Sequence, residues 1–146
     1  MSAPVPCARI LLVEDADDDV YFFQRALKLS GVPAKLTHVG DGGAAVEHLR
    51  RALAGEIELP DLVFLDIKLP IVTGLEVLQW MQTQAFQPRP AVAILSGSEQ
   101  SADIEQAMAI GVSAYFVKPV LAHQLRTRIT DHLAQRAAEA ATQGEA

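Results

Sequence analysis

Polar side chains follow four apolar runs of the sequence, each at the point where the run ends. They are Glu14 and Asp15 after residues 10–13, Asp66 at the end of 62–66, Ser96 after 91–95, and Lys118 after 114–117. Short apolar runs bounded by Pro, Gly and polar residues are typical of strands buried on both faces of a parallel sheet. Ligands of open α/β sheets bind at the carboxyl ends of the strands, so we expect these side chains to form one site.

Three of these side chains are carboxylates that favour a metal ion. Held within a few ångströms of one another, Glu14, Asp15 and Asp66 would repel, each like-charge contact costing on the order of 1 to 4 kcal/mol. A hard divalent cation relieves this repulsion, and Mg²⁺ is commonly held by one or two carboxylates together with a substrate phosphate. The acids at 17–19 are more simply interpreted as the solvated start of a helix, although one of them could reach the metal through water.

Lys118 and Ser96 add a cation and a hydroxyl to the same rim. Each also has an ordinary interpretation. Lys118 could be a surface lysine whose aliphatic stem packs on apolar residues, and Ser96 could be a turn residue. A lysine can neutralise a carboxylate at rest and hold a phosphoryl oxygen later. Together with the acids, these residues match a chemistry in which Asp66 attacks an activated phosphorus while a metal and a lysine absorb the charge.

Strand-like and helix-like segments alternate five times along the chain. This predicts an α/β fold, a doubly wound five-stranded parallel sheet in the order 2-1-3-4-5 with five flanking helices, of the flavodoxin type. The expected strands are 9–14, 34–39, 62–66, 91–95 and 113–117. The first expected helix opens within 15–19 and runs to about 30, and the others are about 44–54, 74–84, 99–110 and 120–138. The helical spacing places Phe23, Ile104, Ala107 and Met108 in the core, with Trp80 or Met81.

Length and composition limit the other possibilities. A chain of 146 residues is one domain's worth, and we expect a flexible arm at 1–7, the domain at 8–138 and a tail at 139–146. The net charge of −6 speaks against nucleic-acid binding. Without a long apolar span or a signal peptide, we expect a cytoplasmic protein that does not bind membranes. The single Cys7 is interpreted as an incidental residue of the arm.

Four segments carry a resemblance to a known family. They are 11–15 (LLVED), 60–70 (PDLVFLDIKLP) with Gly74, 95–97 (LSG) and 114–119 (AYFVKP). With these segments, residues 8 to about 136 resemble the receiver domain of two-component response regulators. The resemblance implies that Asp66 accepts a phosphoryl group from the phosphohistidine of a sensor histidine kinase. It also implies that Asp15, Asp66 and the backbone carbonyl of Lys68 bind Mg²⁺, with Glu14 completing the acidic pair.

The same resemblance assigns the remaining residues. Lys118 contacts the phosphoryl oxygens, and Ser96 with Tyr115 forms a conformational switch toward the surface of the fourth helix, fifth strand and fifth helix. The Lys118–Pro119 bond is expected to be cis. No enzymatic activity is implied beyond accepting and losing the phosphoryl group. The chain departs from the family in having Glu14 for the usual Asp and Ser96 for the usual Thr, and the Lys68 side chain could slow or speed dephosphorylation.

A narrower resemblance concerns short, stand-alone regulators that partner phytochrome-type kinases. It rests on the Val-Glu-Asp-x-x-x-Asp segment at 13–19, followed by Val20-Tyr21-Phe22. Some of these regulators dimerise through the fourth helix, fifth strand and fifth helix. We hypothesise the same homodimer here, with Ile110, Tyr115 and Phe116 as its candidate exposed residues.

Three other functions fit part of the pattern. A hydrolase of the haloacid dehalogenase type would need a second acid two residues after Asp66, where this chain has Lys68. A flavodoxin-like flavin binder would need a phosphate-binding first loop, and the loop here is acidic. A degenerate receiver used only as an interaction scaffold is disfavoured, because every expected functional position holds a competent residue.

Overall fold

One parallel sheet organises the protein. The computed structural model describes residues 7–97 and 102–144, with side chains up to residue 140. The strands are β1 (Ala8–Val13), β2 (Ala34–Val39), β3 (Leu62–Asp66), β4 (Ala91–Ser96) and β5 (Ala114–Val117), and all neighbours pair in parallel. Their order is β2-β1-β3-β4-β5. The predicted fold class and strand order are confirmed.

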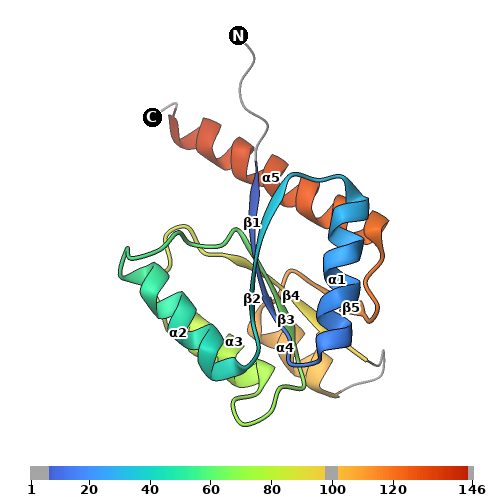
Figure 1. Ribbon diagram of the computed structural model, residues 1–146. Helices are drawn as coiled ribbons and strands as arrows, with labels where there is room; N and C mark the ends of the chain where they lie inside the picture. The colour runs from blue at the N-terminus through green and yellow to red at the C-terminus, as the bar shows by residue number, and fades with distance from the viewer. Residues whose placement is uncertain (1–6, 98–101, 145–146) are drawn as a thin grey trace.

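Five helices cover the two faces of this sheet. They are α1 (Asp17–Ser30), α2 (Gly42–Leu53), α3 (Gly74–Gln82), α4 (Ala102–Ile110) and α5 (Ala122–Gly144). Figure 1 shows α1 and α5 on one side of the sheet and α2 with α3 on the other. The expected start of α4 near residue 99 lies outside the described residues. None of the described helices combines the length and apolar character that a bilayer crossing requires.

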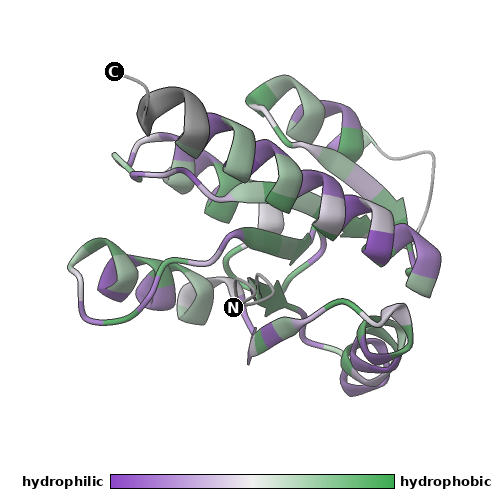
Figure 2. Ribbon diagram, turned by 90° about the horizontal axis from the view of Figure 1, so that it is seen from above, coloured by the Kyte–Doolittle hydropathy of each residue, from purple (hydrophilic) through white to green (hydrophobic). Residues whose placement is uncertain are grey.

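The core lies on both faces of the central strands. Every residue of β3 is buried, which explains why its sequence is a continuous apolar run ending in one acid. On one face, α1 and α5 pack residues such as Phe23 and Ile129 against Phe64, and the rings of Phe23 and Phe64 lie 5.0 Å apart. Figure 2 shows mostly hydrophobic central strands, in green, between helices in which hydrophilic and hydrophobic residues alternate along the ribbon. Each such buried side chain contributes roughly 1.5 to 3 kcal/mol relative to exposure.

The starts of α2 and α3 are fixed by local hydrogen bonds. Asp41 accepts a hydrogen bond from the Ala44 N–H at the start of α2. Thr73 and Glu76 form a capping box at the start of α3, each side chain accepting from the other's backbone N–H. The Thr73 cap defines where the loop after Asp66 ends.

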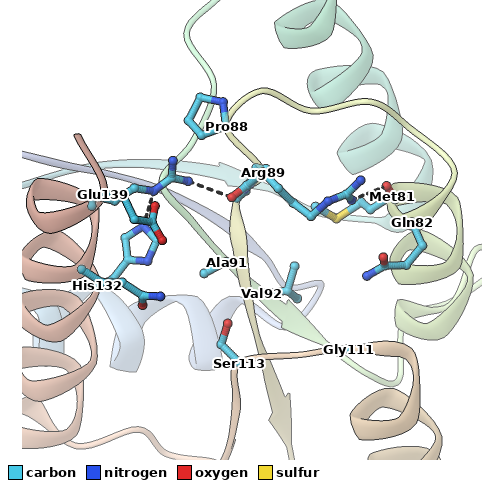
Figure 3. Close-up of a pocket in the computed structure, with 13 residues that line it drawn as sticks. Met81, Gln82, Pro88, Arg89, Ala91, Val92, Gly111, Ser113, His132 and Glu139 are labelled. Carbon is cyan, nitrogen blue, oxygen red and sulfur yellow. Dashed lines mark hydrogen bonds between the residues drawn. The ribbon is translucent and has the colours of Figure 1, made fainter. Parts of the chain in front are cut away.

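The irregular segment between α3 and β4 is held by two arginines. The Arg89 guanidinium donates to the carbonyls of Met81 and Gln84, at 2.8 and 2.7 Å, near the end of α3. Arg136 on α5 donates to the Arg89 carbonyl at 2.7 Å. These contacts border a cavity of about 360 Å³, around which Figure 3 places Arg89, Ser113 and His132. The cavity lies at the amino end of β4, at the opposite edge of the sheet from the polar strand ends.

Several finer sequence predictions were wrong. Met108 is 46% exposed, because α4 turns Ile104 and Ala107 toward the core and places Met108 at the flank. Phe116 and Ile110 are half-buried and pack on the core instead of lying exposed. Helix α5 ends at Gly144, well beyond residue 138, because the Ala-rich stretch 134–142 favours a helix after the apolar periodicity stops. The prediction that Trp80 or Met81 lies in the core is confirmed, since Met81 is buried and Trp80 is half-buried.

Two glycines let the loop after β3 pack closely. A Cβ at Gly74 would lie 2.3 Å from the Asp66 carbonyl oxygen, and one at Gly42 would lie 2.2 Å from that of Val72. Neither distance is possible without backbone movement, so the start of α3 rests directly against the end of β3. The position of Asp66 therefore depends on a glycine at 74.

Replacing this glycine should destabilise the protein and move Asp66. We expect Gly74→Ala to lower the free energy of unfolding by about 2 kcal/mol, as overpacked sites do, measured by urea denaturation. Gly40→Ala is the matched control, since a Cβ at Gly40 meets no atom within 4 Å. Equal free energies of unfolding for Gly74→Ala and Gly40→Ala would contradict the close contact between residue 74 and the Asp66 carbonyl oxygen.

Candidate functional site

The predicted polar residues meet at the carboxyl edge of the sheet. Glu14 follows β1, Asp66 ends β3, Ser96 ends β4 and Lys118 follows β5. Glu14, Asp66 and Ser96 are 1%, 4% and 1% exposed. Parallel strands bring these positions together, because their carboxyl ends share one edge and β1, β3, β4 and β5 are consecutive neighbours.

Lys118 lies at the centre of this group. Its Nζ donates to Glu14 Oε2 at 2.9 Å, to Asp19 Oδ2 at 3.0 Å and to Asp66 Oδ2 at 3.1 Å. An ammonium has three donor hydrogens, so each is matched to one carboxylate. Pro119 follows through a cis peptide bond, as predicted, and the Lys118 N–H donates to the Ser96 carbonyl at 2.7 Å.

Glu14, Asp15 and Asp66 form an oxygen-rich group that fits a divalent cation. One carboxylate oxygen from each lies within 4.8 Å of the others. Glu14 and Asp66 are buried and Asp15 is exposed, so the group has a dry inner side and a solvent-facing outer side. Carboxylate oxygens with room for water on one side are the environment that hard cations such as Mg²⁺ and Mn²⁺ accept.

Backbone contacts orient the two buried carboxylates. The Lys68 N–H donates to Asp66 Oδ1 at 3.0 Å, and the Ala16 N–H donates to Glu14 Oε1 at 3.1 Å. The Lys68 side chain is exposed, and the assignment of its carbonyl as a metal ligand stays a prediction. His38, not expected at this site, brings its Nε2 within 2.8 Å of the Glu14 carbonyl oxygen.

Asp19 is the functional contact that the sequence interpretation missed. The acids at 17–19 were interpreted as a solvated helix start, and Asp17 and Asp18 are indeed exposed. Asp19 is 36% exposed and binds Lys118. Helical spacing could have revealed it, because Asp19 precedes Phe23 by four residues and Ala26 by seven, and both of these face the core.

Tyr115 lies apart from the site. It projects from β5 with 43% exposure, whereas Ser96 is buried at the end of the neighbouring strand. The structure thus places one predicted switch residue at the acidic cluster and the other on an outer surface.

The loop after Asp66 borders an open cleft. Asp15, Lys68, Leu69 and Pro70 line a cleft of about 470 Å³ beside the acidic group. In the same loop, Ile71 is 96% exposed and has a φ of 64°, which is uncommon for a β-branched residue. The cleft therefore borders Asp15 and the residues that directly follow Asp66.

Burial and charge set the protonation of the site. Burial raises the pKa of Glu14 from 4.5 to about 7, although hydrogen bonds from Lys118 and the Ala16 N–H act in the opposite direction. Burial alone would lower the pKa of Lys118, but its hydrogen bonds to the three carboxylates outweigh burial and raise it above its ordinary value. The ammonium therefore stays charged at neutral pH, while Glu14 titrates there.

Comparison with known proteins identifies the family. A sequence model of the response regulator receiver domain matches residues 10–130. The chain belongs to this family.

Named relatives include stand-alone regulators. FilR2 of Methanothrix harundinacea, described as a probable methanogenesis regulatory protein, is 31% identical over 84% of this chain and 79% of its own length. Response regulator Rcp1 of Synechocystis sp. is 34% identical over 75% of each chain. The solved structure of the bacteriophytochrome response regulator RtBRR is 35% identical, with a TM-score of 0.75, covering 87% of this chain and 78% of that one. The Mn²⁺-bound form of Rcp1 is 30% identical, with a TM-score of 0.69, covering 82% and 88%.

Family membership gives the general function. This receiver domain is part of two-component signalling, in which receiver domains interact with sensor histidine kinases. Receiver domains bind a divalent metal at an acidic pocket, and the acidic group of this chain fits one.

Divalent metal affinity should depend on pH through Glu14. A raised pKa means that folding favours protonated Glu14, so its contribution to stability is present below pH 4.5 and is lost as pH rises toward about 7. Metal binding must displace this proton. We expect affinity for Mn²⁺, measured by titration calorimetry, to fall roughly tenfold per pH unit below about pH 7.

Glu14→Gln is the control for this pH dependence. It should bind Mn²⁺ more weakly and show a flatter pH profile over the same range, because its residue 14 does not titrate. Identical pH slopes in the two proteins would rule out Glu14 as the titrating group.

Proposed function

We propose that Asp66 is the phosphoacceptor of a single-domain response regulator. The observation that carries the proposal is the double anchoring of its carboxylate, by the Lys118 ammonium at one oxygen and the Lys68 N–H at the other. A carboxylate fixed in this way, beside a cleft and an acidic metal group, is oriented for attack. Its side chain is 6% exposed, so few waters compete with a phosphodonor.

The transfer is a simple exchange of bonds. An Asp66 carboxylate oxygen forms a bond to the phosphorus of a kinase phosphohistidine, the phosphorus–nitrogen bond breaks, and the imidazole leaves and takes up a proton. Mg²⁺, held by Glu14, Asp15, Asp66 and the Lys68 carbonyl, would neutralise charge on the phosphoryl oxygens. Lys118 offers its ammonium to one of these oxygens. Attack of water on the same phosphorus later releases inorganic phosphate, the one hydrolysis that we assign to the chain.

The proposed donor is a sensor histidine kinase of the phytochrome type. RtBRR supports this choice, since it is described as a bacteriophytochrome response regulator. The proposal places the chain in the cytoplasm, where such kinases hold their phosphohistidine. It includes no nucleic-acid or membrane partner.

Phosphorylation should require Asp66. With Mg²⁺ and acetyl phosphate, we expect about one acid-stable, base-labile phosphoryl group per chain, detected by intact mass spectrometry, because acyl phosphates form at one nucleophile. Asp66→Asn should show none. Asp61→Asn is the control, since Asp61 contacts Arg9 at the opposite edge of the sheet. Absence of label in the unmodified protein would favour the scaffold alternative.

We further propose that Ser96 and Tyr115 carry the signal. The Ser96 hydroxyl would move toward the new phosphoryl group, and the Tyr115 ring would turn inward into the space vacated. Ser96 pairs with Val117, and Ile94 pairs with Tyr115, so the two residues lie on adjacent strands two positions apart. The surface changed by this movement is that of α4, β5 and α5, where Met108 and Tyr115 are exposed.

This surface is the proposed site of a homodimer. We expect the acyl-phosphate mimic beryllofluoride to shift the protein from monomer toward dimer in light scattering, and Tyr115→Ala to reduce the shift. Tyr21→Ala, which removes a similarly exposed aromatic ring from α1, should leave it unchanged. A monomer with and without the mimic would contradict the proposal.

A further inference from the structure

We propose that Asp19 is a positioning residue for Lys118, holding its ammonium at the site when the other two carboxylates engage the metal. The inference rests on the proposed function of Asp66. The inference adds Asp19, which lies on α1, to a site whose other residues lie at strand ends or directly after them.

The three partners of Lys118 are not equivalent. Glu14 and Asp66 belong to the acidic group whose oxygens lie within 4.8 Å of one another, and Asp19 does not. A divalent cation in that group would take lone pairs from Glu14 and Asp66, and it would repel an ammonium only a few ångströms away. Asp19 is then the remaining partner of Lys118, at 3.0 Å.

Without such a partner, Lys118 would have little to keep it in place. Lysine carries a compact charge on a flexible four-carbon stem, and the side chain here is 18% exposed. Repulsion from the metal would turn it toward solvent. A lysine that must meet a phosphoryl oxygen at the instant of transfer gains from a fixed starting position.

The packing of α1 fixes the Asp19 carboxylate. Asp19 lies one turn before Phe23, which is 4% exposed and packs edge-on against Phe64 of β3. Asp19, Phe23 and Lys118 border the same small cavity, with Val120 at its wall. The rotation of α1 about its axis is therefore set by core contacts, and this rotation aims Asp19 at Lys118.

The geometry makes a specific demand on residue 19. The contact needs an acceptor oxygen at that place, which Asn also supplies through its side-chain carbonyl. If Asp19 acts by this hydrogen bond, Asn should replace it and Ala should not. If Asp19 matters only through its negative charge or through the helix dipole, Asn and Ala should behave alike.

The test compares phosphorylation rates at saturating Mg²⁺ with acetyl phosphate as donor. We expect Asp19→Ala to lower the maximal rate about tenfold with little change in the donor concentration at half-maximal rate, since lysine positioning acts on developing charge. Asp19→Asn should recover most of the rate. Asp18→Ala is the matched control, because it removes an exposed acid from the same helix turn, and it should phosphorylate at the wild-type rate.

Other results would overturn the inference. A positioning role would be excluded if Asp19→Ala reacted at the wild-type rate, or if Asp19→Asn were as slow as Asp19→Ala. It would also be excluded if Asp19→Ala changed only the donor concentration at half-maximal rate and not the maximal rate. Equal Mn²⁺ affinity in the Asn variant and the wild type is also required, because Asp19 is not proposed as a metal ligand.

A second readout separates this inference from the proposed function. The ¹⁵N resonance of the Lys118 ammonium, assigned by its loss in Lys118→Arg, should stay visible in Mg²⁺-loaded wild type because hydrogen-bonded ammonium protons exchange slowly. It should disappear in Mg²⁺-loaded Asp19→Ala and persist in Asp19→Asn. Failure of acetyl phosphate to label any protein would refute the function of Asp66 and leave this readout intact. Persistence of the resonance in the Ala variant would refute the role of Asp19.

Discussion

An excess of negative charge at one edge of the sheet is the constraint around which this protein is built. Glu14, Asp19 and Asp66 surround the Lys118 ammonium, and Asp15 stands next to them. Among the described residues, one cation faces these four carboxylates, and the site stays net negative even when Glu14 is protonated, so it attracts a divalent cation. Lys118 serves as the internal counter-ion that lets two of these acids be buried in the folded chain before any metal arrives.

The sheet topology makes this concentration of charge possible. β1 and β3 are adjacent although 48 residues, 14–61, lie between the end of one and the start of the other. β5 lies two strands from β3. Because all strands run in parallel, each crossover brings the chain back to the edge where the strands begin. The carboxyl ends of all strands therefore lie together at the other edge. The arginine contacts of the 85–90 segment secure the opposite edge, away from the chemistry.

Much of this arrangement could be predicted from sequence. Apolar runs ending in polar residues identify buried strands, and parallel pairing then forces their ends together, which is why Glu14, Asp66, Ser96 and Lys118 were expected at one rim. Asp19 was not expected, because its role depends on how Phe23 orients α1, and an acidic first turn has a simpler explanation. The exposure of Met108 depends on tertiary packing, and the length of α5 depends on the helix propensity of alanine. Apolar periodicity alone predicts neither.

The backbone at Ile71 has a consequence for the energy of the resting protein. Its left-handed conformation costs a branched residue roughly 1 to 2 kcal/mol, and its side chain recovers almost nothing by burial, being 96% exposed. Glycine would adopt this φ freely. The loop that follows Asp66 therefore keeps a strained backbone and an exposed apolar side chain, so the resting protein is less stable than a glycine at this position would allow.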